Sequence, residues 1–467
     1  MAHSLSAETP LGIYLACAGG YFHPDLYGKQ DSFGTSIYTS TPLKAGSKVV
    51  CCPFSLAVTP SLARQCIPTT LFPSSPTSQR KSRQPNHEHL CLYLCLHVIP
   101  SKLAQGLTGL HLRHQVYVDN LPSSDSMRTT LYFSPAEREL LRGSNLFGAT
   151  EDRERGWKEE WEEVQGWTSD EEVRKELTWE RWLWACTILS SRAFPSSLID
   201  GDKENSTPVL FPGIDMLNHR PTAKLTWSSD VHVETVGSGE DGKKGKGSLT
   251  IVPDEDTPAD EQVFNTYGAK SNEELLLGYG FVLPSNPADF VALKLALPPS
   301  CSPKLYDLIH SFELDNLRHF VPRSGELPPE LFAQMRLLMA NEEEIDGVEE
   351  NSHMPEEGED VKGYEPRWKA SLGFIGWQNE LDVLDALEGM LHGKLQALVG
   401  QNEVKGDVRN DVRQMVDIYR RGQIDILRAA VEYRDKVFEE TLKRAEEEGV
   451  QLDFDDEMED IDEEDEE

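Results

Sequence analysis

Two short motifs in the second half of the chain constrain its fold and chemistry more than any other feature. Residues 215–219 (Asp-Met-Leu-Asn-His) end an apolar run with an Asn-His pair. Residues 261–268 (Glu-Gln-Val-Phe-Asn-Thr-Tyr-Gly) follow about fifty residues later and are typical of an apolar strand that ends in Tyr-Gly. Gly268 frees the backbone to turn sharply after Tyr267, because glycine lacks a Cβ atom. The order and spacing of the two motifs are more specific than either motif alone.

The segment after the second motif extends this pattern. A short helix is expected after Ser271, with Glu274 three residues on as a capping box, and residues 279–281 (Tyr-Gly-Phe) follow it. The complete pattern resembles the SET-domain protein methyltransferases. It resembles in particular the branch typified by the Rubisco large-subunit lysine methyltransferase and the fungal ribosomal-protein lysine methyltransferases.

The resemblance implies an α+β protein. Its expected parts are a β-rich SET fold with a threaded (pseudoknot) segment and a helical insert, followed by an all-α C-terminal domain. We place the SET domain at residues 1–298, with the insert at about 61–185. A helical substrate-binding domain is expected at residues 299–452, and an acidic disordered tail at 453–467.

Local patterns agree with this division. Residues 28–60 are typical of strands, and the Trp-rich residues 179–189 indicate a buried helix. Ser134, followed by proline and by Glu137, predicts the start of another helix. Apolar residues at spacings of three, four and seven predict a long amphipathic helix between residues 412 and 442. The acidic residues 341–362 are expected to form a loop, and residues 237–247 a flexible hairpin or loop.

Composition limits the possible partners. The 467-residue chain is 38% hydrophobic, which fits a globular protein, and its formal net charge is −35. Residues 455–467 carry 11 carboxylates, which repel one another and favour a solvated tail. This acidity argues against nucleic acid as a partner and favours a basic protein substrate, such as a ribosomal protein, through electrostatic steering. Solubility alone explains the charge equally well.

Other sequence features concern location and metal binding. The apolar runs are too short to span a bilayer and residues 1–24 lack a basic signal-peptide start, so we expect no membrane partner. Eight scattered cysteines favour a reduced cytoplasmic or nuclear location, and we expect a monomer. His87, His89, Cys91, Cys95 and His97 lie close together, but their spacing matches no common zinc site, so no metal is expected.

Methyl transfer from S-adenosyl-L-methionine to an amine needs few protein groups. The cofactor is already activated, so the protein mainly aligns donor and acceptor and excludes water. The acceptor amine must be neutral, which an aromatic-lined, partly desolvated channel promotes. The resemblance makes Tyr267 the catalytic residue, a phenol close to the reacting groups.

The resemblance also implies the remaining site residues. It assigns cofactor contacts to Asp215, Asn218 and His219, and to Arg192 at the carboxylate end of the cofactor. Cofactor contacts are likewise expected from Tyr279, Gly280 and Phe281, which would form the wall toward the acceptor. Phe194 and Tyr279 are expected to bind the substrate side chain.

The expected function is S-adenosylmethionine-dependent N-methylation of lysine in a non-histone protein. Two alternatives stay open. One is a protein-histidine N-methyltransferase of the same fold, which Phe194 disfavours because such relatives carry an asparagine at that position. The other is a catalytically silent SET scaffold that binds partner proteins.

Overall fold

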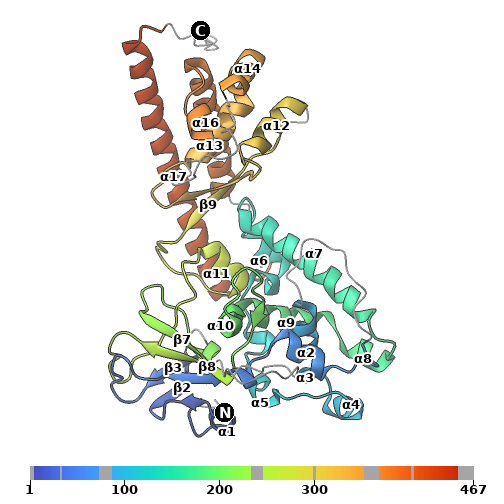
Figure 1. The fold of residues 1–467 in the computed structure, drawn as a ribbon. Coiled ribbons are helices and arrows are strands. Elements are labelled where there is room, and N and C mark those ends of the chain that lie inside the picture. Colours follow the sequence, from blue (N-terminus) through green and yellow to red (C-terminus); the bar gives the residue numbers. More distant parts are fainter. Residues whose placement is uncertain are drawn as a thin grey trace, which may run out of the picture. The chain divides into compact units, whose positions relative to one another are not determined.

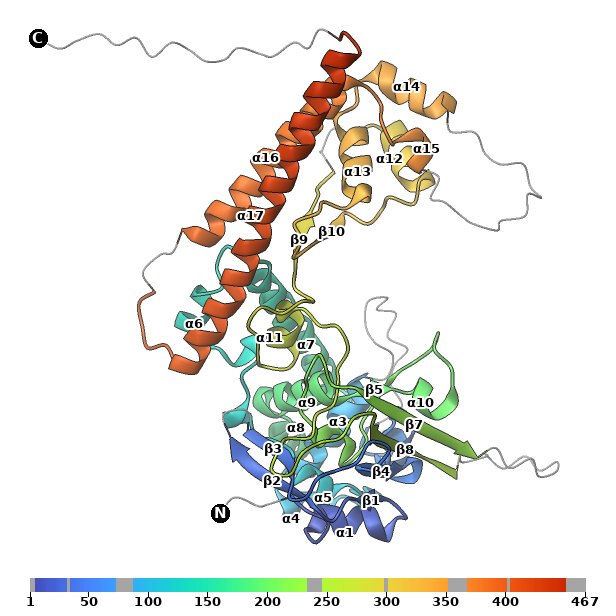
Figure 2. The same cartoon turned by 90° about the vertical axis from the view of Figure 1, so that its left-hand side faces the viewer.

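The computed structural model describes residues 5–31, 34–72, 87–232, 246–297, 301–351, 368–400 and 404–450. The chain divides into two compact units (Figures 1 and 2). Unit 1 comprises Met1–Phe133, Gly148–Lys270 and Glu274–Phe281, and unit 2 comprises Ser134–Phe147, Ser271–Glu273 and Val282–Glu467. The expected acidic tail at 453–467 lies outside the described residues, as does most of the expected loop at 237–247.

The strands of unit 1 are short. A four-stranded antiparallel sheet has the order β1-β4-β8-β7, and its longest ladder joins β7 to β8 from Leu225↔Pro253 to His232↔Lys246. Two separate pairs, β2–β3 and β5–β6, and isolated bridges are also present among the described residues of the unit. The strands are β1 (Tyr21–Phe22), β2 (Leu26–Asp31), β3 (Gly34–Thr39), β4 (Val50–Pro53), β5 (Phe194–Pro195), β6 (Pro208–Val209), β7 (Leu225–His232) and β8 (Lys246–Pro253).

Helices form much of the rest of the chain up to residue 281. The α-helices are α1 (Pro10–Cys17), α2 (Pro60–Cys66), α3 (His87–Val98), α4 (Ser101–Gly106), α5 (Gln115–Val118), α7 (Asn145–Gln165), α8 (Glu171–Glu176), α9 (Trp179–Arg192), α10 (Ser197–Asp200) and α11 (Asn272–Gly278). Short 3-10 turns are η1 (Phe54–Leu56), η2 (Ser124–Ser126), η3 (Thr130–Tyr132) and η4 (Ile214–Met216). The expected buried helix is α9, which begins after the N-cap Thr178 and buries eight consecutive residues.

Helices α3 and α9 pack against each other in the core of unit 1. Helix α3 buries every residue from Leu90 to Leu96, so it is apolar on all sides rather than amphipathic. The cluster around it continues into the sheet through Val50, Leu249 and Ile251. One core therefore joins the helical segment to the four-stranded sheet of unit 1.

Residues 261–265 run between two other segments of unit 1. On one side, the Val263 N–H donates to the Ile37 carbonyl of β3 at 2.8 Å. On the other side, the Asn265 N–H donates to the Asn218 carbonyl at 2.7 Å. The second motif is thus held between β3 and the first motif, which is the arrangement expected of a threaded segment.

Unit 2 is mainly helical. Its elements are α6 (Pro135–Glu139), β9 (Phe290–Lys294), α12 (Pro303–Ser311), β10 (Arg318–Pro322), α13 (Pro329–Met339), α14 (Glu342–Asn351), α15 (Trp368–Ser371), α16 (Trp377–Val399) and α17 (Asn410–Glu447). The long helices α16 and α17 lie side by side (Figure 2) and share a core with β9 and β10. Helix α17 is the expected amphipathic helix, and it buries Val412, Val416, Tyr419 and Leu427 on one side.

Three local features differ from the sequence-based expectation. Residues 261–268 do not form the expected strand, because they pair in turn with β3 and with the first motif through the isolated bridges Tyr38↔Gln262 and His219↔Asn265. The acidic segment 341–362 is not a loop throughout, because Glu342–Asn351 forms α14. Asn341 caps it: the Glu344 N–H donates to Asn341 Oδ1 at 3.0 Å, while Glu344 Oε2 accepts the Asn341 N–H at 2.9 Å. Three acidic residues in the first turn also stabilise α14, because their negative charges lie at the positive end of the helix dipole. The helical C-terminal region also contains a strand, β10, which pairs with β9.

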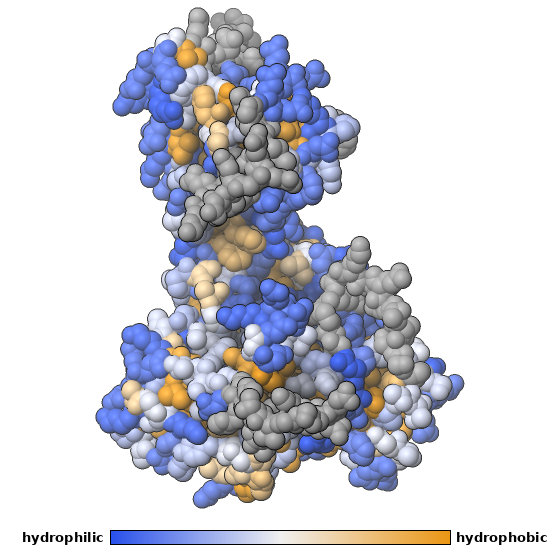
Figure 3. All heavy atoms as spheres, viewed as in Figure 1, coloured by the Kyte–Doolittle hydropathy of each residue, from blue (hydrophilic) through white to orange (hydrophobic). Residues whose placement is uncertain are grey.

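The surface carries few large apolar side chains. On the face drawn in Figure 3, apolar residues form small separate groups among hydrophilic ones. Among the described residues, no helix has both the length and the apolar character needed to cross a bilayer.

Candidate functional site

Tyr267 lies where the two sequence motifs meet. Its backbone N–H donates to Nδ1 of His219 at 3.0 Å, and its hydroxyl donates to the Leu217 carbonyl at 2.9 Å. A parallel bridge pairs His219 with Asn265. Because Nδ1 of His219 accepts a hydrogen bond, the neutral ring carries its proton on Nε2. The first motif therefore holds both the backbone and the side-chain hydroxyl of Tyr267.

Four aromatic rings meet at this point. The His219 and Tyr267 rings stack with centroids 4.9 Å apart and an interplanar angle of 19°. Tyr279 stacks on Tyr267 at 5.1 Å and 21°. Phe281 contacts both His219 and Tyr279, with centroid distances of 6.3 Å. The structure thus brings together four of the residues expected from the sequence in one aromatic site.

Gly280 is required by the backbone between Tyr279 and Phe281. Its φ is +82°, and a Cβ atom there would lie 2.8 Å from the Arg128 carbonyl carbon and from the Thr129 nitrogen. No side chain fits at that distance without movement of the backbone. The close approach sets the direction in which the two flanking rings project. Gly280 therefore shapes the site through its backbone.

Asp215, the first residue of the first motif, is held by hydrogen bonds from two other segments. Its carboxylate accepts hydrogen bonds from Arg192 Nη1 at 3.1 Å and from the Tyr117 hydroxyl at 2.8 Å. Arg192 Nη1 also donates to the Asp215 carbonyl at 2.8 Å. The Asp215 side chain is 0% exposed and that of Arg192 is 22% exposed. The other carboxylate oxygen, Oδ1, is buried without a hydrogen-bond partner in the described chain.

Asn218 and Asn265 link the motifs to the sheet. Asn218 Nδ2 donates to Ser36 Oγ on β3 at 2.7 Å. Asn265 is fully buried, and its Oδ1 accepts from Trp227 Nε1 at 2.9 Å and from the Thr266 N–H at 2.8 Å. Asn265 Nδ2 is a buried donor without a partner among the described residues. Asp215 Oδ1 and Asn265 Nδ2 are thus a buried acceptor and a buried donor that have no hydrogen-bond partner among the described residues.

Burial governs the protonation of the site. It raises the pKa of the Tyr267 phenol, an effect that Arg192 opposes and Tyr279 reinforces. Burial also raises the pKa of Tyr279 and lowers the pKa of His219. The phenols consequently stay protonated and the imidazole neutral at neutral pH. The site offers hydroxyl groups and neutral ring faces, and no phenolate.

Phe194 lies in a neighbouring aromatic cluster. Its ring meets Phe211 edge-on at 5.7 Å and Trp227 at 5.1 Å. Trp227 in turn donates to Asn265, two residues before Tyr267. Phe194 itself is 7% exposed, so most of its surface is used in packing.

The sequence reasoning missed Tyr117, Ser36, Asn265 and Trp227. Tyr117 lies 98 residues from Asp215 and Ser36 lies 182 residues from Asn218, so no local spacing predicts either contact. Asn265 stands inside the second motif, and its polar side chain directly after the apolar Val263 and Phe264 was a signal that could have been used.

Comparisons with known proteins extend this picture. The chain is 28% identical over 409 residues to ribosomal lysine N-methyltransferase set10 of Schizosaccharomyces pombe, covering 85% of this chain and 65% of that protein. It is 24% identical over 370 residues to ribosomal lysine N-methyltransferase 1 of Saccharomyces cerevisiae, covering 70% of this chain and 60% of the relative. The chain therefore spans somewhat less than two thirds of these relatives. No protein-family model matches it.

A solved structure of Rubisco LSMT bound to AdoMet superposes with a TM-score of 0.68 at 18% identity, covering 95% of this chain and 96% of the other. The chain therefore has the SET fold of Rubisco LSMT, and its sequence is similar to the ribosomal lysine N-methyltransferases of that branch. The α+β SET fold with a helical C-terminal region, predicted from the two motifs and the segment after them, is thereby confirmed. The roles of the individual SET-domain site residues stay predictions.

Proposed function

We propose that this chain is an S-adenosyl-L-methionine-dependent protein-lysine N-methyltransferase that acts on a non-histone protein. The observation that carries the proposal is the stack of His219, Tyr267 and Tyr279, with the Tyr267 hydroxyl anchored on the Leu217 carbonyl. The named activities of the set10 and ribosomal lysine N-methyltransferase 1 relatives support it.

The aromatic site suits an uncharged amine. Ring faces on several sides exclude water and lower the pKa of an inserted ammonium group, so that it can lose its proton before attack. The same faces tolerate the cationic product through cation–π attraction. The Leu217 carbonyl accepts from Tyr267 and keeps a second lone pair for an N–H of the acceptor. Tyr267 stays a phenol, so it orients the amine through its oxygen and does not act as a base.

The polar groups next to the stack fit the amino-acid end of the cofactor. When bound, S-adenosyl-L-methionine supplies a methyl group activated by its sulfonium. Its ammonium and carboxylate match the orphaned acceptor Asp215 Oδ1 and the orphaned donor Asn265 Nδ2. Arg192, 22% exposed, adds positive charge for the carboxylate. Asn218 and His219 would contact the cofactor from the first motif.

The proposed substrate is a basic protein, such as a ribosomal protein, bound by a monomer in the cytoplasm or nucleus. Support comes from the formal charge of −35 and from the names of the two fungal relatives. If the carboxylates of residues 455–467 steer the substrate, deleting them slows association at low salt and has little effect at high salt. Turnover at saturating substrate then stays unchanged.

One experiment tests the activity and separates it from the two alternatives. The purified full chain is incubated with methyl-labelled cofactor and a whole-cell extract, and mass spectrometry locates the label. Label on lysine of a non-histone protein is expected. Label on histidine would establish the histidine enzyme instead. A chain that shows no cofactor binding by calorimetry would be a scaffold, and the enzymatic proposal would be withdrawn.

A further inference from the structure

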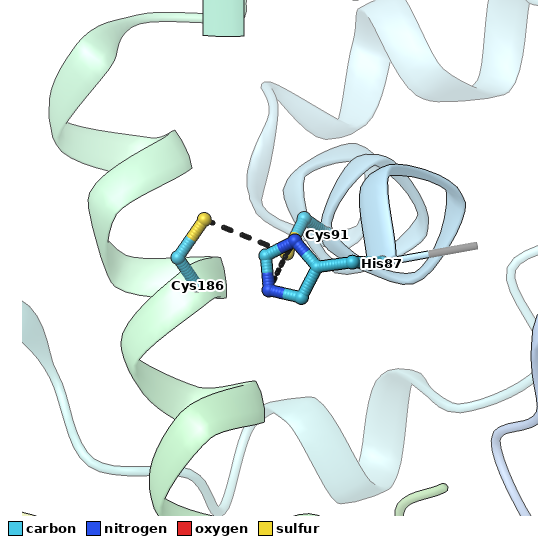
Figure 4. Close-up of side chains that lie close together, drawn as sticks. All are labelled: His87, Cys91 and Cys186. Atoms are coloured by element: carbon cyan, nitrogen blue, oxygen red, sulfur yellow. Dashed lines mark hydrogen bonds between the residues drawn. The ribbon is translucent and has the colours of Figure 1, made fainter. Parts of the chain in front are cut away.

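A cluster of metal-ligating side chains lies in the helical core of unit 1, and the methyl-transfer proposal does not use it. His87 and Cys91 stand four residues apart on α3, and Cys186 projects toward them from α9 (Figure 4). Ligand atoms of these three residues lie within 4.8 Å of one another, and all three residues are buried. Glu160 of α7 approaches His87 from a third helix, with Oε2 at 3.2 Å from Nδ1.

The distances match those of a metal centre. Cys91 Sγ lies 3.6 Å from Cys186 Sγ and 3.7 Å from His87 Nε2. Two thiolates bound tetrahedrally to zinc at about 2.3 Å lie about 3.8 Å apart. A disulfide would need the two sulfurs at about 2.05 Å, and both cysteines are free. The sulfur pair therefore has the spacing of two ligands and not of a bond.

The surroundings make such a polar cluster costly unless it is neutralised. Leu90, Leu92 and Ile188 of the same two helices are 0% exposed. Burying a carboxylate, an imidazole and two thiols among them costs free energy unless the groups are paired or bind a metal. An i, i+4 pair on one helix places both ligands on the same face, as in known helical metal sites.

We propose that His87, Cys91 and Cys186 bind a zinc-type divalent cation, with Glu160 as the positioning residue for His87. Soft thiolates with an imidazole select zinc over the hard cations. Glu160 Oε2 lies 3.2 Å from Nδ1 of His87, so it would accept the Nδ1–H once the ring turns, which leaves Nε2 for the metal. Cys91 Sγ lies almost equally far from the two ring nitrogens, so the imidazole turns about its Cβ–Cγ bond on binding. These residues supply three ligands, and an enclosed water molecule would have to supply the fourth.

The site would tie together three helices of unit 1. Cys186 lies six residues before Arg192 on α9, so a metal there also fixes the helix that carries the partner of Asp215. The sequence-based expectation of no metal considered only residues 87–97. Two other members of that segment have different partners: the Cys95 thiol donates to the Arg181 carbonyl, and His97 Nδ1 bonds with the Tyr93 carbonyl.

The test measures metal binding and does not depend on enzymatic activity. The 467-residue chain is purified without chelator under reducing conditions, and its metal content is measured by plasma mass spectrometry. Equimolar zinc is expected, and Co²⁺ added to the stripped protein should give a thiolate-to-cobalt charge-transfer band. If the parent protein gives no such band and holds no zinc, the proposal is overturned without any variant. A Cys91–Cys186 disulfide in freshly purified protein would also overturn it.

Variants locate the site. Cys186→Ser and Cys91→Ser should each weaken Zn²⁺ affinity at least ~100-fold and reduce the cobalt band. Cys95→Ser is the matched control, because it removes another fully buried α3 thiol and should leave affinity within about twofold. Glu160→Gln should lower affinity about 10- to 100-fold while keeping the cobalt–thiolate band. Equal losses in Cys95→Ser and Cys186→Ser would show that the metal binds elsewhere.

Discussion

The backbone N–H of Tyr267 donates to Nδ1 of His219 at 3.0 Å, and the two rings stack 4.9 Å apart. The two residues lie 48 positions apart in the chain. A ring that both accepts this hydrogen bond and stacks on the same tyrosine cannot move without moving Tyr267. His219 thus positions Tyr267, in addition to any contact it makes with a cofactor.

The Tyr267 hydroxyl is predicted to act in turnover rather than in binding. Tyr267→Phe should reduce methyl transfer by about 10²-fold or more, and change cofactor affinity by no more than a few fold, because the lost interaction acts on the reacting groups. Tyr14→Phe is the matched control, since the Tyr14 hydroxyl also donates to a backbone carbonyl in unit 1, that of Arg113 at 3.1 Å. Single-turnover rates and calorimetry measure both quantities. Full activity of Tyr267→Phe would remove the tyrosine from the mechanism.

Asn218 is predicted to contact the cofactor. Asn218→Ala should weaken S-adenosylmethionine binding by about 1.5–3 kcal/mol if it removes a hydrogen bond to a charged group. Ser36→Ala provides the comparison, because it removes the 2.7 Å bond between these side chains and leaves the carboxamide in place. Calorimetry should show a much smaller loss for Ser36→Ala. Equal losses would mean that Asn218 only holds the loop to β3.

The ion pair between the partly exposed Arg192 and the buried Asp215 is predicted to stabilise unit 1. Arg192→Ala leaves the fully buried Asp215 carboxylate without its cation and should lower the free energy of unfolding by about 3 kcal/mol. Adding Asp215→Asn should restore part of that loss, because the remaining side chain is neutral. Urea unfolding of the single and double variants tests the coupling. Additive losses would show that the two side chains do not depend on each other.

Gly280 is predicted to tolerate no side chain. Gly280→Ala combines a φ of +82° with a Cβ atom 2.8 Å from backbone atoms of Arg128 and Thr129, so it should destabilise the protein by more than about 2 kcal/mol. Gly268→Ala has a similar φ of +87° but open space around the new Cβ, and should cost only about 1–2 kcal/mol. Thermal unfolding of the two variants measures both losses. The difference between them is the cost of the close contacts of the Cβ atom at position 280, since both variants bear the cost of a positive φ.

Glu137 is predicted to make unit 2 sensitive to acid. Its carboxylate is buried but accepts bonds from the side chain and backbone of Arg409 and from the Ser134 N–H, and these bonds bring its pKa down to about 2 from 4.5. A carboxyl with a lowered folded-state pKa stabilises the protein above its unfolded pKa. That contribution is lost as the pH falls from about 4.5 toward 2.

The lowered pKa of Glu137 should contribute about 2 kcal/mol to the free energy of unfolding at pH 7. This figure allows for solvent screening, because the Arg409 side chain is 38% exposed. Glu137→Gln should lower the free energy of unfolding at pH 7 and flatten its fall toward pH 3, as measured by urea unfolding. Glu139→Gln, which alters an exposed pair with Arg142, should leave the pH profile nearly unchanged. A profile of Glu137→Gln that matches the parent would show that this carboxyl does not control the acid limb.

Features that depend on residues close together in the chain could be predicted from the sequence. The Asn-His pair and the Tyr-Gly motif predicted the SET fold through their resemblance to known SET-domain enzymes. The helix at Ser134 was predicted because its capping box is formed by residues three positions apart. The prediction of a loop at residues 341–362 was wrong for α14. It rested on the high density of acidic residues and did not consider that Asn341 and Glu344 can cap a helix.

Contacts between distant residues were decided only by the tertiary structure. Tyr117 reaches Asp215 across 98 residues, and Cys186 reaches Cys91 across 95. No periodicity or spacing encodes such pairs, because helix and strand periods describe only neighbours along one element. The sequence determined which chemical groups the site contains. Packing of α3, α7 and α9 around one apolar core determined which groups meet, since a buried polar side chain must find its partner wherever the fold places one.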